Sequence, residues 1–194
     1  MKHLISLPSG AGPHPLLCFL HGYDEAAPAP LATALMRHGP LNASNLPHVR
    51  ERFVVLAPQL PVAGDHWHRY SDELHELVAT VLDEHEVDAD RMFLTGFSFG
   101  GNGVFDIAAL QGHWWHALWA VDPTRVPERD PDRPVWVTAG AVVRSQGRAF
   151  IDGLNLSLDP QAERVYDDEG DDHVGAAQRA YADERIYAWL LKVR

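Results

Sequence analysis

Short apolar runs recur along the chain and alternate with stretches of helical length, and this alternation restricts the fold more than any other feature. Each run is apolar through most of its length, which is typical of a strand buried on both faces of a sheet. A series of such strands predicts a doubly wound, mostly parallel α/β sheet that is flanked by helices. The runs are LLCFLHG (16–22), FVVLAPQ (53–59), RMFLTG (91–96), ALWAVD (117–122) and PVWVTAG (134–140).

Two amphipathic stretches predict helices that cover this sheet. Residues 71–87 begin with Ser71 as the expected N-cap, carry acidic residues in the first turn, and place Leu74 and Val78 at helical spacing. Residues 178–193 show the same spacing of apolar side chains. Both stretches are therefore predicted to pack one face against the strands.

The connecting segments 23–50 and 122–134 contain prolines and mixed polarity, which predicts long loops. Neither segment is followed by a second independent core. A chain of 194 residues with 46% hydrophobic content can bury its apolar side chains around one core. We therefore expect residues 1–194 to form a single domain, with loop 23–50 as a partial cover of any site.

Composition and charge narrow the classes of partner. The 27 acidic and 16 basic residues give a formal net charge of -11, which opposes binding to nucleic acid or to anionic lipid. The lone cysteine, Cys18, lies in an apolar run and is expected to be a buried free thiol. The first residues resemble no secretion signal, and no run is long enough to span a membrane. A cytoplasmic protein with a small-molecule partner is the expectation.

One serine lies between two glycines directly after an apolar run. In GFSFG, Ser98 has Gly96 and Gly100 two positions away on either side, and a stretch of helical character follows. A strand, a sharp turn and a helix are what a nucleophile elbow requires, because residues without side chains let the strand and the helix approach closely. A polar residue in an ordinary glycine-rich loop is the alternative.

The run 16–22 ends in His21-Gly22-Tyr23, which predicts a second part of the same site. The backbone N–H groups of Tyr23 and of Phe99, the residue after the serine, could together stabilise an oxyanion. An ordinary turn after a strand is the alternative. The general base is expected late in the chain, and His173 follows a candidate last strand, AERVYD, and precedes the last helix. A surface histidine in an acidic loop is the alternative for His173.

The motifs HGY, APQLP, GFSFGG and DDHVG resemble the α/β-hydrolase superfamily. The similarity is to its small carboxylesterases, phospholipases and polyhydroxyalkanoate-depolymerase-like hydrolases, and it covers nearly the whole chain. The resemblance implies that Ser98 attacks an acyl carbon, that His173 relays the proton, and that water releases the acyl enzyme. We expect no cofactor, and the length of the chain leaves little room for a cap domain, which predicts an open cleft.

The acid of the triad is where the chain departs from this group of hydrolases. Members usually carry it in the loop after the strand at 134–140, but this chain has Val143 at that place. Asp122, at the end of the preceding strand, is the preferred substitute, and a carboxylate there could orient the histidine. Asp152, Asp172 or no functional acid remain alternatives, and the last would leave a weakly active or non-catalytic ligand-binding protein.

One aromatic residue and two pairs of histidines are further candidates for binding a substrate or a metal. Trp67 falls in the loop after the run 53–59, where the resemblance places the rim of the site, and we list it as a candidate substrate-lining residue. Anchoring of the loop to the core is the alternative. The pairs His66 and His68, and His113 and His116, lack a matched carboxylate or cysteine partner, so we expect no metal there.

Overall fold

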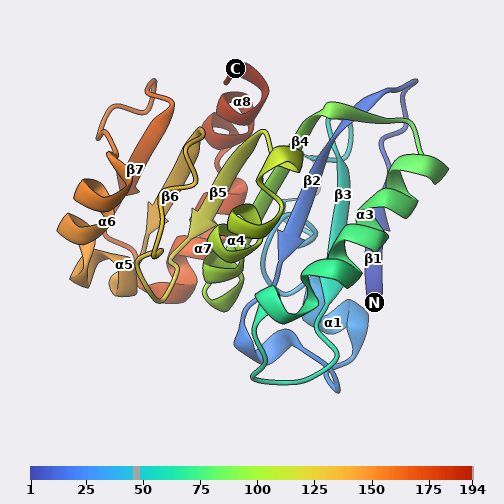
Figure 1. The fold of residues 1–194 in the computed structure, drawn as a ribbon, viewed down its shortest axis with the longest axis horizontal. Coiled ribbons are helices and arrows are strands. Elements are labelled where there is room, and N and C mark those ends of the chain that lie inside the picture. Colours follow the sequence, from blue (N-terminus) through green and yellow to red (C-terminus); the bar gives the residue numbers. More distant parts are fainter. Residues whose placement is uncertain (46–48, 194) are drawn as a thin grey trace.

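The computed structural model describes residues 1–45 and 49–193, in which the central element is a sheet of seven strands (Figure 1). The strand order is β1-β3-β2-β4-β5-β6-β7. Strand β1 is antiparallel to β3, and every other neighbouring pair is parallel. The strands are β1 (Lys2–Ser6), β2 (His14–Leu20), β3 (Val54–Gln59), β4 (Val87–Phe97), β5 (Ala117–Val121), β6 (Val135–Ala139) and β7 (Arg164–Asp168). The mostly parallel sheet that the apolar runs predict is confirmed.

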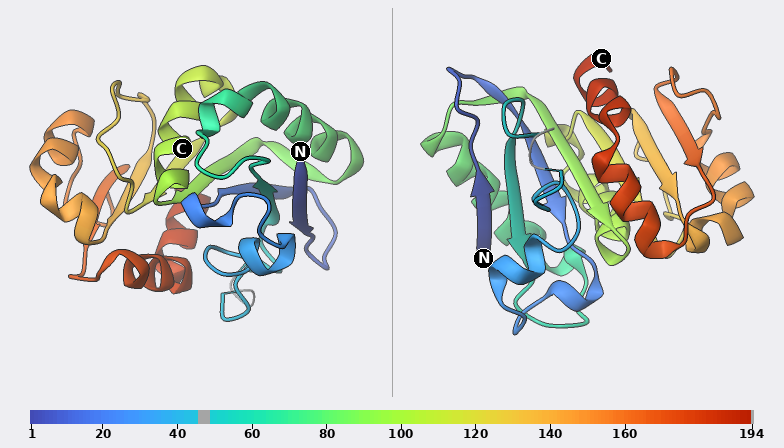
Figure 2. Two further views of the ribbon diagram at one scale, coloured as in Figure 1. Left: turned by 90° about the horizontal axis from the view of Figure 1, so that it is seen from below. Right: turned by 180° about the vertical axis from the view of Figure 1, so that it is seen from behind.

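Helices cover both faces of the sheet. Figure 2 shows α3 and α4 on one side, with α1, α7 and α8 on the other. Two separate clusters of buried side chains lie between these layers and the sheet, one on each face. The helices are α1 (Leu31–Leu35), α3 (Ser71–Glu84), α4 (Phe99–Leu110), α5 (Ala141–Ser145), α6 (Gly147–Leu154), α7 (His173–Ala182) and α8 (Glu184–Lys192), and the 3-10 turns are η1 (Tyr23–Glu25), η2 (Trp67–Tyr70) and η3 (Gly112–Trp114).

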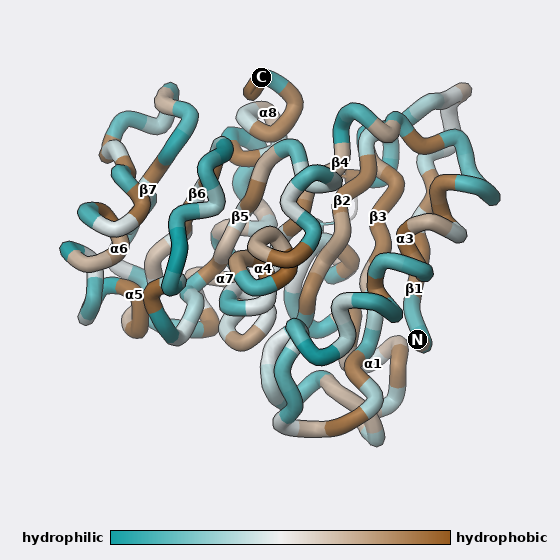
Figure 3. The backbone as a smooth tube through the Cα atoms, in the orientation of Figure 1, coloured by the Kyte–Doolittle hydropathy of each residue, from teal (hydrophilic) through white to brown (hydrophobic). Residues whose placement is uncertain are grey.

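Strand β2 shows why residues 16–20 are all apolar: both of its faces are buried. Leu16 and Cys18 face the cluster on the side of α3 and α4, whereas Leu17 and Phe19 face the cluster on the side of α7 and α8. Figure 3 shows the same hydrophobic character along the central strands. Cys18 is a buried free thiol, as expected, and its burial raises the pKa of the thiol far above the ordinary value.

Several predicted boundaries were wrong. Strand β1, at the antiparallel edge of the sheet, was not predicted. Ser71 is the first residue inside α3 and not its N-cap, since the 3-10 turn η2 runs directly into that helix. The predicted helix 178–193 is two helices, because Asp183 has extended backbone and its side chain caps α8 by accepting a hydrogen bond from the Arg185 amide.

The two predicted loops differ from each other. Segment 23–50 contains the short elements η1 and α1, and residues 46–48 of this prediction lie outside the described residues. Segment 122–134 has neither helix nor strand, as predicted. In the described parts of the chain, 1–45 and 49–193, we find no helix with the length and apolar character that a membrane span needs.

Candidate active site

Ser98 occupies the sharp turn between β4 and α4. Its backbone has φ 57 and ψ -115, a conformation that a residue with a side chain adopts only when its surroundings enforce it. The Ser98 amide donates a hydrogen bond to the Val121 carbonyl at 2.9 Å. A Cβ atom at Gly100 would overlap the carbonyl oxygen of Leu20, so the start of α4 lies against the end of β2. This is the close approach for which the glycines of an elbow are needed.

His173 is the first residue of α7, at the carboxyl end of β7. Its Nε2 lies 3.0 Å from Ser98 Oγ. The ring also packs against Phe97, with 4.7 Å between the ring centroids. Asp172 holds the helix start by accepting a hydrogen bond from the Gly175 amide. The fold therefore brings together a serine and a histidine that are 75 positions apart in the sequence.

Asp122 follows β5 and completes a chain of hydrogen bonds. Its Oδ2 lies 2.6 Å from Nδ1 of His173, and its side chain is 0% exposed. The other oxygen, Oδ1, accepts hydrogen bonds from the amides of Gly140 at 2.9 Å and Val143 at 2.8 Å. These donors hold the carboxylate in one orientation, which is what a group that orients a histidine needs.

The other candidates for the acid lie elsewhere or have other contacts. The Asp172 side chain caps α7 and is exposed. Asp152, on α6, pairs with Arg148 at 3.4 Å, and its side chain is largely exposed. Val143, where the resemblance would put the acid, is buried and contributes its backbone amide to Asp122. Of these acids, Asp122 is the one whose side chain is hydrogen-bonded to the His173 ring.

Tyr23 and Phe99, whose amides we expect to bind an oxyanion, begin η1 and α4 respectively. Their rings are in edge-to-face contact at 5.1 Å, so the two segments meet beside Ser98. Buried His21 fixes the turn before Tyr23. Burial lowers the pKa of His21 to about 4, and the neutral ring accepts a hydrogen bond from the Leu60 amide and donates one to the Gly22 carbonyl.

Trp67 does not line the site. Its side chain is 2% exposed, its Nε1 donates a hydrogen bond to the His21 carbonyl at 3.2 Å, and its ring fills the space above Gly103 on α4. The expected substrate contact is therefore wrong, because the ring anchors the loop between β3 and α3 to the core. The alternative, that a loop aromatic packs inward, describes this residue.

Two polar residues near the site were missed from the sequence. The Glu25 side chain is buried, and it accepts a hydrogen bond from the Gly22 amide at 2.6 Å. Its other oxygen has no hydrogen-bond partner among the described residues and lies 3.8 Å from Nε2 of His38. His38 in turn packs on Phe97 and borders a polar hollow of about 270 Å³ next to α7. Glu25 reaches back three residues to the Gly22 amide, as the acid of a capping box does, but Gly22 has no side chain to complete the box, so the sequence carried no such signal.

No family model matches the chain, and no curated protein matches it in sequence. Similarity is found among solved structures. A thermostable esterase superposes with a TM-score of 0.73 at 18% identity, covering 98% of this chain and 58% of the esterase. FphF, a fluorophosphonate-binding serine hydrolase of Staphylococcus aureus, gives 0.69 at 18% identity, covering 98% and 92% of the two chains. The S-formylglutathione hydrolase FrmB of the same organism gives 0.66 at 20%, covering 94% and 84%.

At such low identity these likenesses establish the fold alone. The chain spans a little over half the length of the thermostable esterase and nearly all of FphF. The predicted fold, a mostly parallel sheet flanked by helices, is shared with these esterases and serine hydrolases and is confirmed. What the chain does must be argued from its own side chains.

Proposed function

With the α/β-hydrolase fold as the starting point, we propose that this protein is a serine hydrolase that cleaves carboxylic ester or thioester bonds through an acyl enzyme. The observation that carries the proposal is the chain of hydrogen bonds from Asp122 through His173 to Ser98, at 2.6 and 3.0 Å. Structural similarity to esterases and serine hydrolases supports the same reaction class. Within that class, a carboxylesterase or lysophospholipase-like activity is our proposal.

The first step makes the acyl enzyme. Nδ1–H of His173 donates to Asp122, so Nε2 is free to accept the Ser98 hydroxyl proton as Oγ attacks the carbonyl carbon. The carbonyl oxygen then carries a negative charge, which the amides of Tyr23 and Phe99 stabilise. Each such donor is worth about 3 to 4 kcal/mol in the transition state.

The second half of the cycle uses the same groups. His173 returns the proton to the leaving oxygen or sulfur, and the alcohol or thiol departs. Water takes its place, His173 accepts a proton from it, and the hydroxide attacks the acyl carbon. Collapse of this second tetrahedral intermediate releases the acid and restores the Ser98 hydroxyl.

The rival function is a non-catalytic ligand-binding protein on the same scaffold. The reason to consider it was that the sequence has no acid in the loop after the strand at 134–140, where the hydrolases that the sequence resembles usually carry one. The contact between Asp122 and His173 supplies an acid from another strand, which favours the enzyme.

Hydrolysis of p-nitrophenyl esters of increasing chain length, by wild type and Ser98→Ala, tests the proposal. We expect turnover by wild type, a loss of at least a thousandfold in Ser98→Ala, and labelling of wild type alone by a fluorophosphonate probe. Ser9→Ala, at an exposed serine in the loop between β1 and β2, is the matched control and should retain the wild-type rate. Equal rates for wild type and Ser98→Ala would exclude Ser98 as the nucleophile.

A further inference from the structure

Four aromatic rings form a row that includes Phe99, the residue after Ser98, and we call Tyr23, Phe99, His66 and His68 the ring row. Tyr23 and Phe99 meet edge to face at 5.1 Å. Phe99 and His66 stack at 5.6 Å with 15° between their planes, and His66 and His68 stack at 5.6 Å with 16°. These are the separations at which aromatic pairs attract one another. The row is continuous and contains the residue that follows the nucleophile.

The ring row differs from an ordinary aromatic anchor in its exposure. Tyr23 is 52% exposed, His66 and His68 are exposed, and Phe99 is half-buried. Trp67, between the two histidines in the sequence, is buried and already anchors this loop to the core. His68 also lies 3.7 Å from Asp106 on α4, so it has a second contact outside the row, whereas the His66 ring contacts only its neighbours in the row among the aromatic rings of the described residues. The exposed parts of Tyr23, His66 and His68 remain available to a ligand at the surface.

The position of the ring row relative to the reacting atoms determines what it can bind. Tyr23 and Phe99 contribute the two amides proposed for the oxyanion, so the carbonyl group of a substrate would lie next to their rings. A planar aromatic group one or two bonds from that carbonyl would reach the same faces. A saturated ring of the same size is thicker and could contact them only through its C–H groups, which is a weaker interaction.

Resting on the proposed function, we propose that the ring row binds an aromatic ring of the ester substrate and makes the enzyme selective for aryl over saturated cyclic esters. The aryl group could belong to the acid or to the alcohol of the ester. Both sources share the same chemistry, a flat apolar ring that stacks on exposed side-chain rings. The structure thus assigns a class of substrate to the site.

Two pairs of esters test this selectivity and separate the two sources. Methyl phenylacetate and methyl cyclohexylacetate differ only in the ring on the acid, and benzyl acetate and cyclohexylmethyl acetate only in the ring on the alcohol. In every ester a methylene group insulates the ring from the reacting bond, so intrinsic reactivity changes little within a pair. We expect kcat/KM to favour the aryl ester by about five- to tenfold in at least one pair, which is the scale of one or two ring contacts.

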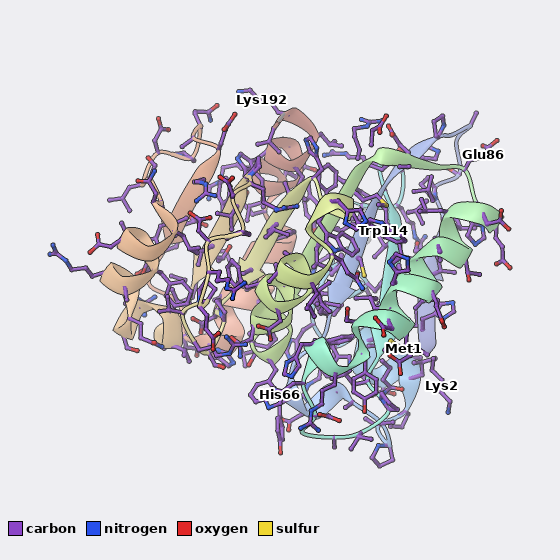
Figure 4. The ribbon with its side chains drawn as sticks, viewed as in Figure 1. Met1, Lys2, His66, Glu86, Trp114 and Lys192 are labelled. Carbon is purple, nitrogen blue, oxygen red and sulfur yellow. The ribbon has the colours of Figure 1, made fainter. Side chains whose placement is uncertain are left out.

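Variants locate the selectivity on the ring row. His66→Leu keeps a side chain of similar size but removes the stacking face, and we expect the aryl preference to fall to less than half its wild-type value. His75→Leu is the matched control, because the His75 ring also packs on an aromatic, Trp114, at 4.0 Å but outside the ring row. Figure 4 shows Trp114 and His66 in separate parts of the molecule. The His75→Leu preference should equal that of wild type.

A binding measurement keeps this proposal separate from the proposed function. Ser98→Ala cannot turn over either ester, so its dissociation constants for each pair can be compared by ligand-observed NMR. Preferential binding of the aryl ester supports the ring row even if wild type hydrolyses none of the four esters, a result that would count against the hydrolase alone. Equal treatment of aryl and cyclohexyl esters in both pairs, or a preference that survives His66→Leu, would overturn the proposal.

Discussion

Two buried carboxyl groups lie near the Ser98 turn, and the protein gives them different numbers of hydrogen-bond donors. Asp122, after β5, accepts hydrogen bonds from the amides of Gly140 and Val143 and contacts His173. Glu25, in η1 after β2, accepts one from the Gly22 amide, and its second oxygen finds no hydrogen-bond partner within residues 1–45 and 49–193. Both side chains are almost completely removed from solvent, at 0% and 3% exposure.

The difference teaches how a fold prepares a buried carboxylate for a role. A buried negative charge is stabilised when several N–H groups point at it, and the start of α5 supplies such donors to Asp122. Glu25 has too few donors, and burial raises the pKa of its carboxyl to about 7. The segment after β6, where the resemblance implied an acid, thus supplies the amides that hold the acid of the neighbouring strand.

Asp122→Asn, which removes the charge of the better-bound carboxylate, should have the largest effect on activity. Asparagine keeps the shape of the side chain, but its amide group would present a donor to Nδ1–H of His173 and favour the wrong tautomer. We expect kcat for a p-nitrophenyl ester to fall about 10⁴-fold, or about 5 kcal/mol of barrier, with little change in thermal unfolding. Asp152→Asn, on the exposed face of α6, is the control and should leave kcat unchanged. A wild-type rate for Asp122→Asn would remove this acid from the mechanism.

Glu25→Gln should change the pH dependence of stability. The folded pKa of Glu25, about 7, is above its ordinary value of 4.5, so between these values the folded state holds a proton that the unfolded state has released. Glu25 therefore makes wild type less stable as pH rises from about 4.5 to about 7, by about 3 kcal/mol in total. Below this window the penalty is absent, and above it the penalty is constant.

Urea unfolding of wild type and Glu25→Gln across pH 4.5 to 8 measures this penalty. The neutral side chain can still accept from the Gly22 amide, so the variant should gain stability relative to wild type as pH rises. His21, whose pKa burial lowers to about 4, acts in the opposite direction but equally in both proteins, so its effect cancels in the difference. Glu86→Gln is the control, since Glu86 also accepts from a glycine amide, that of Gly12, but is exposed. Parallel stability curves for wild type and Glu25→Gln would mean that Glu25 is ionised throughout.

The sequence was most informative where one local pattern had one structural solution. Apolar runs of strand length specified the parallel strands, and Gly-Phe-Ser-Phe-Gly specified the turn, because close approach of β4, α4 and β2 tolerates no side chain at Gly100. Strand β1 was missed because an edge strand needs no continuous apolar run. The split between α7 and α8 was missed because the helical spacing of apolar residues continues across Asp183. Only the capping role of the Asp183 side chain marks the start of a new helix.

Contacts between distant segments were the harder part. The sequence identifies Asp122 as one of several candidate acids. What distinguishes Asp122 is the pair of amides 18 and 21 positions away that bind its carboxylate, and only the folded sheet brings these amides to it. Burial of Trp67 likewise depends on the absence of a side chain at Gly103, in a different element. Glu25 and His38 lie in a segment of mixed polarity. Its apolar residues have no regular helical or strand spacing, so the sequence cannot tell a buried polar side chain there from an exposed one.

Gly140→Ala tests the support of Asp122 with the smallest change. The backbone of Gly140 has φ -108 and ψ -161, which alanine can adopt, so any effect comes from the added methyl group. That group would overlap Oδ2 of Asp122, the oxygen that contacts His173, and would lie 2.9 Å from the Asp172 carbonyl oxygen. Displacing the carboxylate by a fraction of an ångström to an ångström should lower kcat up to about 10²-fold, with KM changed much less.

Gly153→Ala is the matched control for this substitution. Its new methyl group, on α6, would lie 3.7 Å from a Val126 side chain, which is an ordinary contact. In a helix, alanine is favoured over glycine by about 0.5 to 1 kcal/mol, so this variant should be as active as wild type and slightly more stable. If Gly140→Ala matched Gly153→Ala in kcat, the space around Asp122 would have no part in orienting His173. The contrast between the two buried carboxyl groups would then have no bearing on the rate.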